Sequence, residues 1–389
     1  MSARGRLRWG IGKSTILGVA VLAIGLSACS SDSADDAGDT DPEQVTTVPE
    51  AIVATIDVGN NPVDPGFTPD SSTVYIGSNG DNEVLVIDAA SNTVTDTLAV
   101  GDKPLTTIVL DDGSAAYLSN TGDGTVSVID TTDQTVTETV QVGDAPADVI
   151  ALPDGSAVYV PNRADDSVSV IDTSSNTVTT TLNVGNNPTT GVALPDGETI
   201  YTANVGDGSV SVIDTATNEV TETIEVGDTP RIGALLPDGS ALYVINGGSE
   251  TTSVIDTATN TVTETIETPF IRPGATSPDG SKVYLISWGE GLLLTIDTST
   301  NEVSSSLAVG DNPTRVDVLP DGSAVYVTTD GDLAEEGGGA VAIVDAAGEN
   351  VVATVAVGGA PSSLGVLPDG SAVYVNSPES DKAYVLGSP

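Results

Sequence analysis

The stretch that decides the fold is PADVIALPDGSAVYVPNRADDSVSVIDTSSNTVTTTLNVGNN, residues Pro146 to Asn187, because versions of it fill the chain from Ala51 to Pro389. This unit of about 42 residues is present eight times. Its Pro-Asp-Gly turn recurs at Pro153, Pro195, Pro237, Pro278, Pro320 and Pro368, with looser versions at Pro69 and Asp111, and its tyrosine recurs at Tyr75, Tyr117, Tyr159, Tyr201, Tyr243, Tyr284, Tyr326 and Tyr374. Self-similarity at this period is typical of repeat architectures, in which each unit buries its apolar face against its neighbours.

One unit predicts four short strands and no helix. The strands are expected over Asp148 to Leu152, Ala157 to Val160, Ser167 to Ile171 and Thr177 to Val184. A Pro-Asp-Gly turn separates the first two, because proline presets φ and glycine tolerates a positive φ. The last strand alternates threonine with apolar residues, which suits an outer edge. Four short strands per repeat predict the blade of a β-propeller.

The two ends of the chain predict how the ring closes. After Pro361 the sequence supplies only three strands, Ser363 to Leu367, Ala372 to Val375 and Ala383 to Leu386. The missing fourth strand is expected at the other end, over Ala51 to Val58. We therefore predict an all-β, eight-bladed β-propeller of four-stranded blades, whose last blade is closed by the N-terminal strand. A seven-bladed ring with one unit outside is the alternative.

The repeated motifs resemble a known family. YVPN at Tyr159 to Asn162, YTAN at Tyr201 to Asn204 and SVIDTATNEVTETIEVGDTP at Ser211 to Pro230 look like the YVTN-repeat β-propellers of archaeal surface-layer proteins and of bacterial cell-surface and secreted proteins. The resemblance covers nearly all of residues 51–389. It implies the propeller fold, but no particular activity, because the repeated residues build blades and propellers serve many functions.

The N-terminus predicts where the protein is located. A basic region over residues 4–13 precedes an apolar run from Ile16 to Leu26, and LSAC at Leu26 to Cys29 resembles a bacterial lipobox. We expect a lipoprotein signal peptide over 1–28, a lipidated Cys29 with a disordered acidic tether over 29–50, and the propeller over 51–389. The predicted location is extracytoplasmic, with a lipid anchor in the cell membrane as the only membrane contact.

Composition excludes several kinds of chemistry. The chain has no histidine, and Cys29 is its only cysteine. Haem, copper and the usual zinc sites lack their ligands, and Ser-His or Cys-His nucleophilic catalysis lacks its residues. We therefore predict no cofactor and no enzyme activity. Ca²⁺ bound by acidic loops, such as those around Asp123 and from Asp330 to Glu336, is a secondary hypothesis without an EF-hand pattern to support it.

The net charge bears on partners. The chain has 11 basic and 56 acidic residues, a formal charge of −45. Removing residues 1–28 takes away four basic and no acidic residues, so the charge falls to −49. Such a surface repels phosphate backbones, and we predict no nucleic-acid binding. The expected partner is an unknown protein, a glycan or a small anionic ligand, and the expected state is a monomer.

Basic residues are rare, and three of them occupy corresponding places in the repeat. Arg231, Arg272 and Arg315 begin the first strand of the fifth, sixth and seventh units, and the first strand of a blade lines the central channel. The repeat is also broken here, with Phe270 and Trp288 in the sixth unit. Breaks in a repeat often mark binding sites. We predict a ligand or partner site at Arg231, Phe270, Arg272, Trp288 and Arg315. Salt bridges for the arginines and a packing role for Trp288 are the alternative.

The function predicted from these observations is a binding or cell-surface interaction module. Two alternatives remain at this stage. One is an enzyme that processes an anionic ligand with arginines and carboxylates at the channel mouth. The other is a structural component of the cell envelope, which predicts ordered self-association and no soluble ligand.

Overall fold

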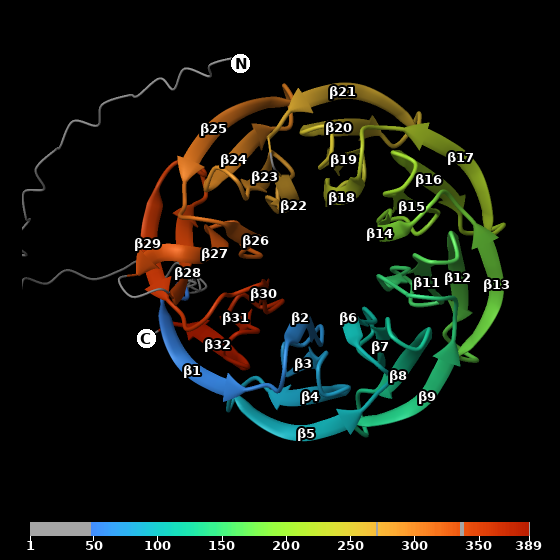
Figure 1. Cartoon of the computed structure of the whole chain (residues 1–389), viewed down its shortest axis with the longest axis horizontal. Coiled ribbons are helices and arrows are strands. Elements are labelled where there is room, and N and C mark those ends of the chain that lie inside the picture. Colours follow the sequence, from blue (N-terminus) through green and yellow to red (C-terminus); the bar gives the residue numbers. More distant parts are fainter. Residues whose placement is uncertain (1–47, 270, 335–337, 389) are drawn as a thin grey trace, which may run out of the picture. The chain divides into compact units, whose positions relative to one another are not determined.

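The computed structural model describes residues 48–388 except 270 and 335–337. In these residues, 32 strands form eight four-stranded antiparallel sheets, arranged as blades around a central axis (Figure 1). The residues that the structure describes contain no α-helix. The predicted eight-bladed propeller is confirmed.

The first four blades follow each other along the chain. Blade one contains β2 (Pro62–Phe67), β3 (Thr73–Ser78), β4 (Glu83–Asp88) and β5 (Thr93–Ala99). Blade two contains β6 (Pro104–Val109), β7 (Ala115–Asn120), β8 (Thr125–Asp130) and β9 (Thr135–Gln141). Blade three contains β10 (Ile150–Ala151), β11 (Ala157–Asn162), β12 (Ser167–Asp172) and β13 (Thr177–Asn183). Blade four contains β14 (Pro188–Ala193), β15 (Thr199–Asn204), β16 (Ser209–Asp214) and β17 (Glu219–Glu225).

The remaining blades complete the ring. Blade five contains β18 (Pro230–Leu235), β19 (Ala241–Asn246), β20 (Thr251–Asp256) and β21 (Thr261–Glu267). Blade six contains β22 (Ile271–Thr276), β23 (Lys282–Ser287), β24 (Leu292–Asp297) and β25 (Glu302–Ala308). Blade seven contains β26 (Pro313–Val318), β27 (Ala324–Ala334), β28 (Gly338–Asp345) and β29 (Val351–Ala356). Blade eight contains β30 (Ser363–Val366), β31 (Ala372–Ser377), β32 (Lys382–Gly387) and β1 (Ala51–Asp57).

Blade eight is built from both ends of the propeller, as predicted. β1 runs antiparallel to β32, with Ala51 opposite Gly387 and Asp57 opposite Lys382. Lys382 also forms an ion pair with Asp57. All eight sheets are therefore completed by described residues, and we expect the chain from Val48 onward to fold on its own. The alternative of a seven-bladed ring is wrong.

The apolar core lies between neighbouring blades. One cluster combines Ile150, Val168 and Leu182 of blade three with Ile200 and Ile213 of blade four, and all five side chains are buried. Each blade shares such a cluster with the next. Each sheet therefore buries its faces against its two neighbours. This mutual burial holds the inner strands around the axis.

A hydrogen-bonded tyrosine belt also links the blades; it consists of Tyr75, Tyr117, Tyr159, Tyr201, Tyr243, Tyr284, Tyr326 and Tyr374, all buried. In the most regular blades the hydroxyl donates to an asparagine in the last turn of the next blade, as Tyr159 does to Asn218 at 2.5 Å. Tyr374 donates to Asn92 at 2.8 Å and so joins blade eight to blade one. Tyr326 donates to the carbonyl of Pro49 at 3.0 Å, because in blade eight the chain ends replace that turn.

The inner strand of blade three is shorter than predicted. The expected strand, Asp148 to Leu152, is reduced to the two residues of β10. The Asp148 carboxylate accepts hydrogen bonds from the backbone N–H of Val149 at 2.9 Å and of Gly191, in blade four, at 3.2 Å. These N–H groups are therefore held by a side chain. Pro146 keeps only an isolated bridge to Asn162.

Candidate functional site

The three predicted arginines occupy equivalent positions in the inner strands of three consecutive blades. Each pairs with the residue two positions after the belt tyrosine of its blade: Arg231 with Ile245, Arg272 with Ile286 and Arg315 with Thr328. Arg315 lies one residue further from the start of its strand than the other two. A β-bulge between Pro313 and Arg315 compensates for this difference.

The structure brings these arginines together in one pocket of about 660 Å³. The pocket is lined by the first residues of the inner strands of blades one, two, five, six, seven and eight, so it lies at the axis, at the end where these strands begin. A second cavity of about 360 Å³ shares Asp64, Pro273 and Arg315 with it. The channel mouth inferred from the repeat is therefore a real hollow.

Arg315 has carboxylate partners. Its guanidinium forms an ion pair with Asp64 of blade one. Burial lowers the pKa of Arg315, and the charge of the nearby Asp317 opposes that shift. Burial raises the pKa of Asp317, although its carboxylate accepts hydrogen bonds from the N–H groups of Val318 and Val366. The salt-bridge alternative thus applies to Arg315.

Arg231 and Arg272 differ from Arg315. Among the described residues, neither forms an ion pair with a carboxylate. Partial burial lowers the pKa of Arg231, and the positive charges of Arg163 and Arg272 lower it further. The Arg272 guanidinium lies over the Trp288 ring, 5.7 Å from the ring centroid. Within the described residues, the N–H groups of Arg272 form no hydrogen bond, so they remain available to a ligand.

Trp288 flanks the site without lining the pocket. Its side chain is 43% exposed, so it does not fill a gap between blades as the packing alternative required. Phe270, the fifth predicted residue, and Cys29, the predicted lipidation site, lie outside the described residues.

Sequence reasoning missed Ser363, at the start of β30. Ser363 lines the pocket and is 2% exposed, and its Oγ has no hydrogen-bond partner within the described part of the chain. A buried hydroxyl without a partner is costly, which makes it a candidate contact for a ligand. The sequence could have indicated Ser363 by its position two residues after Pro361. This is near the start of the first strand of its unit, where Arg231 and Arg272 lie in theirs.

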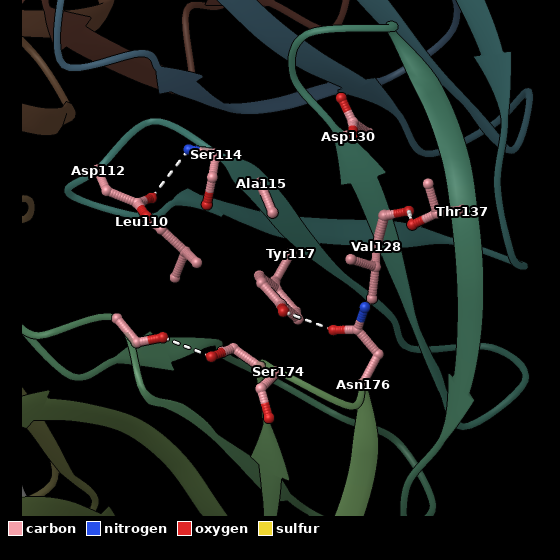
Figure 2. A pocket seen from close by; sticks show the side chains of 12 residues that line it. Leu110, Asp112, Ser114, Ala115, Tyr117, Val128, Asp130, Thr137, Ser174 and Asn176 are labelled. Carbon is pink, nitrogen blue, oxygen red and sulfur yellow. Dashed lines mark hydrogen bonds between the residues drawn. The ribbon is translucent and has the colours of Figure 1, made fainter.

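A smaller cavity of about 200 Å³ lies between blades two and three (Figure 2). Its polar groups bind each other. Tyr117 donates to Asn176 at 2.6 Å, and Asp112 accepts from the N–H of Ser114 at 2.9 Å (Figure 2). These contacts recur from blade to blade, so this cavity is a product of the repeat. It contains none of the predicted site residues.

Within the described residues, no group of three or more acidic, histidine or cysteine side chains could hold a metal ion. No helix among them is long and apolar enough to cross a membrane.

Comparison with known proteins supports the fold. Neither a protein-family model nor a curated protein sequence matches the chain. Among solved structures, a chain of hydrazine synthase from Kuenenia stuttgartiensis is similar, with a TM-score of 0.59 and 23% sequence identity. The match covers 90% of this chain and 99% of that one. At this level of identity, the similarity shows a shared fold alone.

Proposed function

We propose that this protein is an extracytoplasmic, lipid-anchored propeller of the YVTN-repeat type, and that it acts as a binding module with an anion site at its axis. One observation carries the binding proposal. Arg231 and Arg272 line the axial pocket without carboxylate partners among the described residues, in a chain whose formal charge is −45.

The chemistry of these arginines suits an anion. A guanidinium presents a rigid fork of N–H donors that matches carboxylate or phosphate oxygens. Each charge-assisted hydrogen bond contributes about 1.5–3 kcal/mol, and immobilising the ligand offsets part of that gain. Two such contacts together contribute about 3–6 kcal/mol, which corresponds to binding in the millimolar to tens-of-micromolar range.

Binding is a better proposal than turnover. The carboxylates next to the pocket already have partners: Asp64 pairs with Arg315, and Asp317 accepts from the N–H groups of Val318 at 2.8 Å and Val366 at 3.1 Å. The chain also has no histidine to serve as a general base. We therefore assign the arginines to recognition.

A calorimetric titration tests the anion site. A panel of carboxylates, phosphates and acidic glycans is titrated at fixed ionic strength into protein lacking residues 1–45. We expect at least one compound to bind, and Arg272→Ala to weaken its affinity by about tenfold or more. Lys282→Ala is the matched control, because it removes the same charge at a residue whose Nζ donates to the carbonyl of Ala346 in the neighbouring blade, away from the pocket. Binding by no member of the panel would refute the proposed function.

The lipid anchor has its own test. Cys29→Ser removes the thiol that would carry the lipid. This variant should incorporate no fatty-acid analogue during metabolic labelling, whereas the parent protein with Cys29 should incorporate it. Equal labelling of both proteins contradicts the anchor.

The purified propeller should sediment as a monomer, whereas an envelope component would form ordered assemblies.

A further inference from the structure

Two aliphatic side chains lie opposite the arginines in the axial pocket. Arg231 and Arg272 are the second residues of β18 and β22, and the second residues of β2 and β6 are Val63 and Leu105. In a ring of eight, blade five faces blade one and blade six faces blade two, and Figure 1 shows β18 and β22 across the axis from β2 and β6. All four side chains line the same pocket. The arginines therefore face an apolar wall that consists of Val63 and Leu105, and the polar Asn61, Asp64 and Thr106 line the pocket beside it.

Most polar groups of the pocket are already bonded within the protein. Thr106 donates to the carbonyl of Ala147 at 3.2 Å, Asn79 to that of Pro104 at 2.8 Å, and Thr314 to that of Pro361 at 2.7 Å. Within the described residues, the side-chain donors of the pocket that have no hydrogen bond or ion pair are those of Arg231, Arg272, Ser362 and Ser363. A ligand rich in hydroxyl groups would find few partners on the wall formed by blades one and two.

The neighbouring cavity, which meets the pocket at Asp64, Pro273 and Arg315, has further apolar lining. That cavity, of about 360 Å³, is lined in part by Pro65, Phe67 and Leu364. Val63 and Leu105 are only partly buried, so a ligand that covers them removes aliphatic surface from water. The apolar area favours a ligand body that is itself apolar.

We infer that the pocket takes an amphipathic organic anion, with its charged head against Arg231 and Arg272 and an aliphatic or aromatic body against Val63 and Leu105. This inference rests on the proposed anion site and specifies the chemical class of its ligand. The pocket volume is within the range of small-molecule sites, about 300–1,000 Å³.

A homologous series tests the apolar wall. Linear alkanoates of four, six, eight and ten carbons, below their micellar concentrations, are titrated calorimetrically into protein lacking residues 1–45 at pH 7.5. Affinity should rise about three- to fourfold for each added methylene until the chain fills the pocket. Alkyltrimethylammonium ions with the same chains should not bind, because their charge is repelled by both arginines.

Variants separate the two walls. Leu105→Asn should flatten the dependence on chain length while leaving the affinity for butanoate unchanged, and Leu105→Ile should preserve the dependence. Arg272→Ala should weaken binding of every alkanoate by a similar factor. Thermal unfolding of each variant checks that the ring is intact.

The outcomes distinguish this inference from the proposed function. If anions bind through the arginines with equal affinity at every chain length, the amphipathic ligand is wrong and the anion site remains. If the cationic amphiphiles bind as well as the alkanoates, the inference is also wrong. If no anion of any length binds, both proposals fail.

Discussion

Asp148 shows how one side chain changes both local structure and response to pH. Its carboxylate ties blade three to blade four through the N–H of Gly191, and it also accepts a hydrogen bond from the N–H of Val149, next to the short strand β10. It lies in the channel wall, where burial raises the pKa to about 6 and the two hydrogen bonds oppose that shift. An acid whose pKa is raised by folding stabilises the fold when protonated, and this contribution is lost as the pH rises through the folded pKa.

Asp148→Asn should therefore change the pH dependence of stability. Asparagine keeps an acceptor but carries no charge, so the free energy of unfolding of the variant relative to the parent should be higher at pH 7.5 than at pH 4. The increase should be roughly 1–3 kcal/mol. Urea unfolding at the two pH values measures it. A difference that is the same at both values would mean that Asp148 titrates normally in the folded protein.

At the scale of elements, β1 closes the ring. It completes blade eight along β32, and the segment just before it supplies the Pro49 carbonyl to Tyr326 and the Glu50 N–H to Gly387. Without β1, β32 would become an exposed edge strand, and the hydroxyl of Tyr326 would lose its acceptor. Closure therefore depends on a strand far from its partner in sequence.

A protein that begins at Asn61 should be much less stable than one that begins at residue 46. The loss of one ladder and its packing should lower the free energy of unfolding on the order of several kcal/mol. Thermal melts of the two proteins compare them directly. Identical midpoints would show that β1 contributes nothing to closure.

The repeat made most of the strands predictable, because turn residues and tyrosines mark each of them. The strand predicted over Thr177 to Val184, for example, is β13 to within one residue. The contact between Asp148 and Gly191 was not predictable, because it joins residues of different blades that are 43 positions apart in the sequence. Local patterns do not encode such contacts.

The candidate site was only partly predictable. The convergence of the arginines follows from equivalent positions in a closed ring. The pairing of Arg315 with Asp64 could not be read from the sequence, because it depends on a bulge and on contact between blades seven and one. Nothing in the repeats that contain Val63 and Leu105 marks these two residues as part of a binding site. They gain significance only when the ring places them opposite Arg231 and Arg272.

At the scale of the whole molecule, charge opposes compactness. Many turn aspartates are stabilised locally, as where hydrogen bonds from Ser277 and Ser281 lower the pKa of Asp279 to about 2. These bonds do not cancel the mutual repulsion of 56 acidic residues against 11 basic ones. Salt screens this repulsion, because the Debye length falls from about 30 Å at 0.01 M to about 10 Å at 0.1 M.

The melting temperature should therefore rise as NaCl increases from 10 to 500 mM. If screening alone acts, MgCl₂ and CaCl₂ at equal concentrations should give equal midpoints. Differential scanning calorimetry measures both effects. A midpoint that does not change with NaCl would show that charge repulsion does not limit the stability of the fold. A higher midpoint in CaCl₂ than in MgCl₂ would reveal a specific calcium site.

From Tyr75 to Tyr201, each tyrosine of the belt donates to a side chain 59 residues further along the chain. A gene that gains or loses one in-frame repeat among these blades still encodes an acceptor for every tyrosine. Unequal recombination between such similar repeats would change the number of blades inherited and leave the chemistry of each blade contact intact. The number of blades is thus open to heritable variation, provided that the strands from the two ends of the propeller still pair to complete the last blade.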